Sequence, residues 1–470
     1  MTGADGAPGR EGAEPERGES PLDGGRSEID EALRRRAVRV LVRNWRGAST
    51  VPSAALYPHQ WSWDSAFVAI GLARWAQRRA QTELASLFGG QWADGRMPHI
   101  VFNPAVPEKA YFPGASFWRS RRASPSTPTS TSGIVQPPIH AVAALAVVDH
   151  AREPERAAGF ARRIYPRLTA QSLYLSTCRT VAGLGLAALV HPWESGLDNS
   201  PAWDAPMAAI PAELGLLRVH RRRDLQNAGV HERPTDQDYA RYVRLAIAYR
   251  DADYDDLTYW HDAEFCVVDP LVNALWAWSE EALAELAMRI GADPGPHRDR
   301  AAQLVEAMCT NLYDDGLGTF VAYDVRKGSR IPVRTVGGLV PLVLAGLPAH
   351  IVERLLATLR SASFGLGDQA VHGIPSYDLT ASDFDGHRYW RGPAWQNTSW
   401  LIWRGLQVHG RHLLASQLRA DMLSLAASAG FREYFDPRSG RGHGAHQFSW
   451  SAALAIDLLE EPTRRRSDRL

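Results

Sequence analysis

Apolar positions recur along most of this chain with the spacing of amphipathic helices, about every three to four residues. The stretch 27–45 shows the pattern well: Ile29, Leu33 and Leu41 fall on one face behind a capping-box start. The same spacing predicts further helices near 63–75, 77–88, 138–151, 153–178, 235–252, 262–290, 296–314, 335–346, 348–361, 393–409, 411–428 and 449–460. A persuasive strand pattern occurs only in GTFVAYDV at 318–325. The chain is therefore predicted to be all-α.

Short turns join several of these helices, which predicts helical hairpins such as 63–75 with 77–88 and 393–409 with 411–428. About a dozen helices paired in this way can close into an (α/α)6 barrel, which is the fold that we expect. Two separate helical bundles are the alternative. No internal repeat indicates a solenoid. Pro270 is expected to kink or end the helix over 262–290.

Four connections are too long to be simple turns: 89–136, 181–234, 362–392 and 429–448. Structureless loops beyond about 15 residues are usually functional or disordered. Disordered segments rarely carry many aromatic residues. These loops contain Trp92, Trp118, Trp193, Trp203, Tyr389 and Trp390. We therefore expect ordered loops that gather at one end of the barrel and form a sugar-binding pocket there.

Composition narrows the class of protein further. The 470 residues are 45% apolar, and 52 Lys and Arg balance 52 Asp and Glu, so the charge favours neither nucleic-acid nor anionic-membrane binding. No apolar run reaches the roughly 18 residues of a membrane span. We expect a disordered tail over 1–26, one barrel domain over 27–460 and a basic tail over 461–470. The first tail lacks a signal-peptide core, which predicts a cytoplasmic protein.

Metal and cofactor chemistry finds little support in the motifs. Cys178, Cys266 and Cys309 lack metal or redox spacing, so we predict buried thiols. His443 and His446 belong to no HExxH or Cys–His pattern, which favours ordinary loop histidines. No nucleophile elbow or phosphate-binding loop is placed between a strand and a helix. We predict neither a metal nor a cofactor.

Many of the 16 tryptophans stand beside hydrogen-bonding residues, as in YPHQWSWD at 57–64 and RYWRGPAW at 388–395. A sugar has an apolar ring face and a polar edge, so flat aromatic faces flanked by polar groups suit it. Each tryptophan taken alone would more often simply anchor its loop. The clusters together indicate a carbohydrate ligand.

Glycoside hydrolysis needs two carboxyl groups across the scissile bond, one protonated near neutral pH and one ionised. Such groups generally come from different loops. The candidates in the long connections are Glu194, Asp198, Asp204, Asp383, Asp385, Glu433 and Asp436. Spacing does not choose among them, and Asp198 in DNSP also fits an Asx turn before proline.

Several ordered segments resemble the bacterial glucosylglycerate and mannosylglycerate hydrolases of glycoside hydrolase family 63. They are LYPHQWSWDSAFVAIGLA (56–73), QWADGRMPHIVF (91–102), YFPG (111–114), SGIVQPPIHA (132–141), HPWESGLDNSPAWD (191–204), RPTDQDYARY (233–242), RYWRGPAW (388–395), EYFDP (433–437) and QFSWSAA (447–453). The resemblance implies an (α/α)6 barrel and an inverting hydrolase of compatible-solute metabolism, which releases glucose or mannose from a small hexosylglycerate.

The resemblance also assigns roles to single residues. Asp198 in WESGLDNSP matches the general acid, and Glu433 in EYFDP matches the general base. Arg233 and Tyr239 match the pair that grips the glycerate carboxylate, for which a guanidinium fork is well suited. Tyr111 matches a mobile loop at one side of the pocket. Matches to residues around the sugar are Tyr57, Trp61, Asp64, Gln136, Trp193, Tyr389, Trp390, Trp395 and Gln447.

Other functions stay open at this point. An α-glucosidase or trehalase-like hydrolase of a neutral α-glucoside would have little use for Arg233. A carbohydrate-binding protein without catalysis would not need both Asp198 and Glu433. An isomerase or epimerase on the same barrel would be expected to use histidines. The sequence leaves open the choice of glucose or mannose, and whether the chain forms a homo-oligomer.

Overall fold

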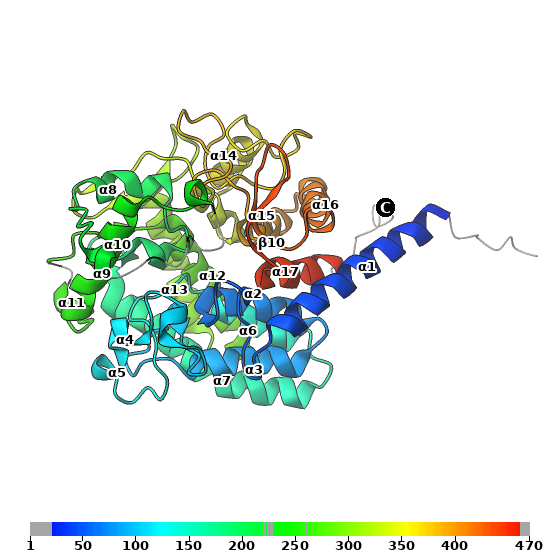
Figure 1. Ribbon diagram of the computed structural model, residues 1–470. Coiled ribbons are helices and arrows are strands. Elements are labelled where there is room, and N and C mark those ends of the chain that lie inside the picture. Colours follow the sequence, from blue (N-terminus) through cyan, green and yellow to red (C-terminus); the bar gives the residue numbers. More distant parts are fainter. Residues whose placement is uncertain (1–20, 220–221, 223–224, 226–228, 260, 461–470) are drawn as a thin grey trace, which may run out of the picture.

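Helices make up most of the protein, seen here in a computed structural model that describes residues 21–219, 222, 225, 229–259 and 261–460 (Figure 1). The basic tail predicted over 461–470 lies outside these residues, and so does most of the tail predicted over 1–26. The first helix, α1 (Pro21–Asn44), begins before Ser27, where the sequence pattern placed its start. It reaches outward from the rest of the molecule (Figure 1).

An inner ring of helices forms the centre of the fold. In chain order, it consists of α2 (Ser62–Ala73), α6 (His140–Asp149), α12 (Pro270–Ile290), η8 (Val340–Val343), α15 (Gln396–Val408) and α17 (Ser449–Glu460). Each packs on the next, and α17 packs back against α2 to close the ring. Every residue of α2 is buried. A helix covered on all sides in this way has no need of a polar face.

An outer layer covers the ring. Each of the following helices packs on the inner element that precedes it in the chain: α3 (Gln77–Phe88), α7 (Pro154–Tyr174), α13 (Gly295–Asn311) and α16 (His412–Ser428). In addition α1 packs on α17, and α14 (Ala349–Arg360) follows η8 and buries its apolar face. This alternation of inner and outer helices is the (α/α)6 barrel that the hairpin pattern predicted.

Smaller elements order the long connections. Short helices between the barrel helices are α4 (Ala115–Trp118), α5 (Ser120–Ala123), α8 (Asp204–Ala208), α9 (Leu216–Val219) and α11 (Asp256–Tyr259), whereas α10 (Asp236–Asp251) is the 16-residue helix predicted over 235–252. An antiparallel sheet runs in the order β3 (Thr180–Val181), β4 (Leu186–Leu189), β5 (Val267–Val268), β8 (Tyr323–Asp324) and β9 (Ser329–Arg330). Three antiparallel pairs are β1 (Gln60–Trp61) with β2 (Ile100–Val101), β6 (Tyr313–Asp314) with β7 (Thr319–Phe320), and β10 (Arg432–Phe435) with β11 (Gly442–His446).

Some predicted elements were wrong in detail. The helix expected over 262–290 starts only at Pro270, since the side chain of Asp269 accepts the Val272 N–H (2.8 Å) and proline is well tolerated in a first turn. The helix expected over 335–346 consists of two 3-10 turns, η7 (Val336–Gly338) and η8, in a stretch with two glycines and a proline. The strand expected over 318–325 is divided into β7 and β8.

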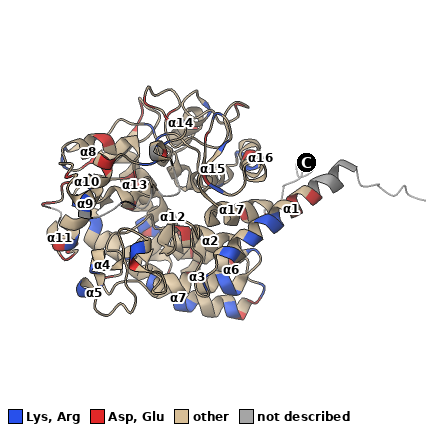
Figure 2. Cartoon of the chain, in the orientation of Figure 1, with Lys and Arg blue, Asp and Glu red and all other residues tan. Residues whose placement is uncertain are grey.

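Three expectations from composition concern the cysteines, the charged residues and membrane spans. Cys266 is buried as predicted, but Cys178 and Cys309 are only half-buried. Acidic and basic residues are interspersed along the helices (Figure 2). Among the described residues, no helix is both long and apolar enough to cross a bilayer.

Candidate active site

One pocket is lined by side chains from all four long connections. It lies where several inner helices begin: Asp64 is in the first turn of α2, Trp450 in that of α17, and Gln136 shortly precedes α6. Backbone N–H groups at helix starts favour negative charge nearby. The barrel therefore brings aromatic side chains, acids and helix N-termini to a common place.

Most of the predicted site residues line this pocket. They are Tyr57, Trp61, Asp64, Tyr111, Gln136, Trp193, Asp198, Arg233, Tyr239, Tyr389, Trp390 and Glu433. The remaining candidate acids of the long connections, including Glu194 and Asp204, do not line it. Of the seven candidate acids only Asp198 and Glu433 line the pocket, and Asp64, predicted only as a sugar contact, adds a third carboxyl group there.

Two predicted sugar contacts lie elsewhere. Trp395 is buried behind the pocket, where its ring stacks on Trp390 with centroids 3.8 Å apart and its Nε1 donates to the Tyr389 carbonyl (3.2 Å). Gln447 is exposed, and its backbone is left-handed with φ 51°. Its carbonyl accepts a hydrogen bond from Asn44 Nδ2 of α1 (2.8 Å). Trp395 therefore supports the pocket wall, whereas Gln447 faces a separate hollow beside α1.

The sequence interpretation missed other lining residues, which are Trp63, His99, Phe112, Tyr242, Phe448 and Trp450. Two of them make polar contacts through their side chains: the Tyr242 hydroxyl donates to the Asp198 carbonyl (3.1 Å), and His99 is a buried imidazole. Its Nδ1 lies 2.6 Å from Ser132 Oγ, and its ring lies nearly parallel to that of Trp193. Burial, with a smaller contribution from His191, lowers the pKa of His99 well below its usual value, so the imidazole is neutral. Its place inside the motif QWADGRMPHIVF was the available clue.

Glu433 is held from three directions at a β-bulge of the β10–β11 hairpin. Its Oε1 accepts the Tyr57 hydroxyl (2.7 Å), and its Oε2 accepts Arg233 Nη2 (2.9 Å) and the Ala445 N–H (2.7 Å). The opposite residue, Gly444, has φ +65°, and a Cβ there would come closer than 3.0 Å to the Glu433 carboxylate. The bulge and the glycine together aim a fully buried, charge-balanced carboxylate into the pocket.

Arg233 contacts Glu433 and two tyrosines of the pocket. Its Nη1 donates to the Tyr57 hydroxyl (2.9 Å), and its Cζ lies 4.5 Å from the centre of the Tyr389 ring. The side chain is 3% exposed, yet its Nε has no hydrogen-bond partner among the residues that the structure describes. Buried donors are rarely left unused. Arg233 therefore has donor capacity to spare for a ligand.

The segment after Arg233 is fixed by a capping box at the start of α10. The Thr235 hydroxyl accepts the Asp238 N–H, and the Asp238 carboxylate accepts the Thr235 N–H, both at 3.1 Å. Tyr239 follows in the first turns of α10, where its hydroxyl donates to the Phe112 carbonyl (3.3 Å). This contact ties α10 to the loop of Tyr111, whose ring meets the Trp61 ring edge-on.

Asp198 lies between two short helical turns, η3 (Pro192–Ser195) and η4 (Pro201–Trp203). The Ser200 N–H donates to the Leu197 carbonyl (2.9 Å), so the Asp198 carboxyl is not needed to cap this turn. Burial raises the pKa of Asp198 to about 7; Arg233 opposes this shift and Glu433 adds to it. A carboxyl group whose pKa is raised by burial and a carboxylate that accepts three hydrogen bonds thus share the pocket.

Asp64 adds a third carboxyl group. Burial raises its pKa well above the ordinary value, and the nearby Glu433 and Asp198 add to the shift. A neutral Asp64 can donate a hydrogen bond to a ligand hydroxyl. Among the described residues, no group of three or more His, Cys, Asp or Glu side chains is placed to hold a metal ion. The polar side chains that line the pocket include three carboxyl groups, the guanidinium of Arg233, His99 and Gln136.

Known proteins share this chain's sequence and fold over nearly its full length. The model of the mannosylglycerate hydrolase MGH1-like glycoside hydrolase domain matches residues 57–451. A mannosylglycerate hydrolase of Rubrobacter radiotolerans is 40% identical over 433 residues, which cover 92% of this chain and 97% of the relative. A glucosylglycerate hydrolase of Mycolicibacterium hassiacum is 35% identical over 442 residues, covering 91% and 97%. The crystal structure of a family 63 mannosylglycerate hydrolase from Thermus thermophilus, with Tris and D-glycerate, has a TM-score of 0.84 at 39% identity, covering 90% of this chain and 99% of that one.

Proposed function

The chain belongs to the family of mannosylglycerate hydrolase MGH1-like glycoside hydrolases, and we propose that it releases glucose or mannose from a hexosylglycerate with inversion. Membership makes it a glycoside hydrolase. The observation that carries the choice of substrate is the buried guanidinium of Arg233, which lines the pocket and whose Nε–H has no hydrogen-bond partner among the described residues. A neutral glycoside offers no charged group that would match it.

In the proposed reaction Asp198 donates its proton to the glycosidic oxygen as the bond to the anomeric carbon breaks. A water on the opposite face of the ring attacks that carbon and gives its proton to Glu433. Asp198 ends ionised and Glu433 protonated, and exchange with solvent restores both. Supporting observations are the pKa of about 7 at Asp198 and the ionic contact of Glu433 with Arg233.

Arg233 has two tasks in this proposal. One hydrogen bond from each Nη is used inside the protein, on Tyr57 and Glu433. The remaining N–H groups, Nε among them, would hold the glycerate carboxylate together with Tyr239. Loss of Arg233 would therefore weaken substrate capture and also leave the base without its partner.

The ratio of the kcat/KM values on two substrates separates these two tasks of Arg233. Glucosylglycerol resembles glucosylglycerate but lacks the carboxylate. The wild type should prefer the glycerate, and Arg233→Ala should abolish that preference, because breaking a buried charge pair costs on the order of 2–5 kcal/mol. The damage to Glu433 lowers kcat on both substrates and cancels in the ratio of their kcat/KM values.

Arg391 provides the matched control. It forms ion pairs with Asp204 and Asp383 (2.7 and 2.9 Å) and does not line the pocket. Arg391→Ala should leave the preference for glucosylglycerate unchanged. An Arg233→Ala variant that keeps the wild-type preference would show that the carboxylate is held elsewhere.

A further inference from the structure

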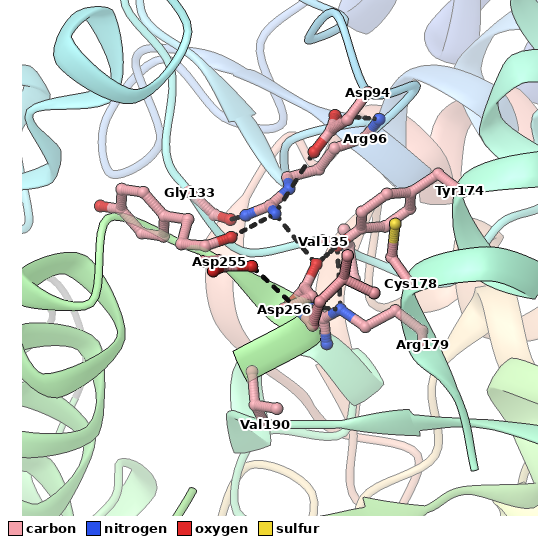
Figure 3. A network of polar contacts seen from close by, with 12 residues as sticks. Asp94, Arg96, Gly133, Val135, Tyr174, Cys178, Arg179, Val190, Asp255 and Asp256 are labelled. Atoms are coloured by element: carbon pink, nitrogen blue, oxygen red, sulfur yellow. Dashed lines mark hydrogen bonds and ion pairs between the residues drawn. The ribbon is translucent and has the colours of Figure 1, made fainter. Parts of the chain in front are cut away.

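A buried ionic cluster lies behind the pocket and contributes no side chain to its lining. It consists of Arg96, Asp256, Arg179 and Glu194, which are 2%, 4%, 1% and 0% exposed. Figure 3 shows Arg96 and Arg179 meeting at Asp256. Burying four charges is expensive even when they are paired, and apolar side chains of the same volume often stabilise a protein as well. The cluster therefore calls for an explanation beyond stability.

The charges alternate along a continuous chain of contacts. Arg96 Nη2 lies 2.9 Å from Asp256 Oδ2, and Arg179 Nε lies 3.0 Å from Asp256 Oδ1. Arg179 then binds Glu194 with both Nη atoms, at 2.9 and 2.8 Å. The hydroxyls of Tyr174 and Tyr249 also donate to Asp256. Each carboxylate is thus held by several donors from different elements.

Glu194 joins two walls of the pocket. Its Oε1 accepts the Val135 N–H (3.2 Å), and its Oε2 accepts the Val190 N–H (2.8 Å). Val135 directly precedes Gln136, which lines the pocket, and Arg96 holds the same segment through the Gly133 carbonyl (3.0 Å). The carboxylate therefore connects the segment of Gln136 with the turn that carries the acid.

The path from Glu194 to Asp198 is short and stiff. The Ser195 hydroxyl donates to the Pro192 carbonyl (2.7 Å) and accepts the Leu197 N–H (2.9 Å). Gly196 has φ +72°, and a Cβ there would come closer than 3.0 Å to the Trp63 ring. Because these contacts restrain the backbone between Glu194 and Asp198, a displacement of Glu194 also displaces Asp198.

We propose that Glu194, held by Arg179, is a positioning residue that aligns the proton of Asp198 with the glycosidic oxygen. This inference rests on the proposed function, since it assumes that Asp198 is the acid. Each oxygen of Glu194 accepts two N–H groups, so in Glu194→Gln the amide NH2 meets two donors whichever way it lies. The substitution keeps the size of the side chain but pushes the turn out of place.

Comparing substrates with two different leaving groups distinguishes a displaced Asp198 from a damaged fold. An alcohol leaving group needs the proton of Asp198, whereas fluoride departs from a hexosyl fluoride without it. Glu194→Gln should lose about 10²-fold in kcat on glucosylglycerate, since a misplacement near 1 Å costs that much. Its loss on the hexosyl fluoride of the same anomeric configuration should be far smaller. The ratio of the two rates does not depend on how much of the variant is folded.

Glu280 is the matched control because it is another fully buried carboxylate, bound to Trp276 Nε1 (3.0 Å) and His297 Nδ1 (2.6 Å) away from the pocket. Glu280→Gln should lower both rates equally, if at all. If Glu194→Gln yields no folded protein, Arg179→Lys tests the same contact, since it keeps the charge but loses the fork, and it should show a smaller selective loss.

The outcomes separate the two proposals. A wild type that cleaves the hexosyl fluoride but neither glucosylglycerate nor mannosylglycerate would contradict the proposed function. A wild type active on the fluoride and on a hexosylglycerate, together with equal losses on both substrates in Glu194→Gln and Arg179→Lys, would overturn the positioning role alone.

Discussion

Asp198 and Glu433 are carboxyl groups of one pocket, and their neighbours distinguish them. Burial favours the protonated form of Asp198, whereas Glu433 accepts hydrogen bonds from Tyr57, Arg233 and the Ala445 N–H. Pairs of titratable groups with such different surroundings commonly mark an acid and a base. The assignment from sequence motifs thus acquires a physical basis.

The pKa of Asp198 predicts the pH dependence of activity. As the proposed general acid, Asp198 works only while protonated, and burial moves its pKa up to about 7. Activity should therefore be lost as pH rises through about 7, with kcat/KM falling roughly tenfold per further pH unit. A pH–rate profile of hexosylglycerate hydrolysis measures this limb. A limb at the ordinary pKa of aspartate, or none up to pH values well above 7, would contradict the account.

Residue identity was easier to predict than side-chain direction. The motifs indicated Tyr57, Asp198 and Glu433, and all three line the pocket. They gave no means of knowing that the backbone at Gln447 is left-handed and leaves its side chain exposed. His99 was missed for a similar reason, since a histidine inside a loop motif shows its direction only once the loops are folded.

The helices followed from periodicity wherever one face is polar. For α3 even the predicted ends agree with the structure, and α14 buries only one face. Periodicity failed at η7 and η8, where Gly337, Gly338 and Pro341 disfavour a continuous α-helix despite the apolar pattern. Two inner helices, α2 and α17, approach each other closely at Gly71, since a Cβ there would come closer than 3.0 Å to the Ala453 carbonyl of α17.

The close approach of α2 and α17 at Gly71 predicts the effect of adding a methyl group at this position. Gly71→Ala should force α2 and α17 apart and destabilise the protein by about 1–3 kcal/mol. Gly159 of α7 is the control, because the nearest atom to a Cβ there is the flexible Arg163 Nη1 at 3.4 Å. Gly159→Ala should instead stabilise by about 0.5–1 kcal/mol. Denaturant unfolding measures both, and a neutral Gly71→Ala would show that the ring does not depend on this approach.

On the scale of the whole molecule, the barrel brings distant parts of the chain into one pocket. The contact between Tyr57 and Glu433 spans 376 positions in sequence, and that between Arg233 and Glu433 spans 200. Closure of α17 onto α2 makes the first contact possible. Local sequence patterns do not reveal such long-range pairs. The sequence therefore offered seven candidate acids, of which only Asp198 and Glu433 line the pocket in the folded protein.

The most direct test of the proposed function is proton NMR of the purified protein with glucosylglycerate or mannosylglycerate, with trehalose as the neutral control. The account predicts that hexose and glycerate appear from at least one of the two hexosylglycerates, far faster than hexose from trehalose. The anomer seen first should be opposite to that of the substrate linkage, because water attacks the face opposite to the leaving group. Release of hexose from trehalose alone, or a first product that retains the configuration of the linkage, would contradict it.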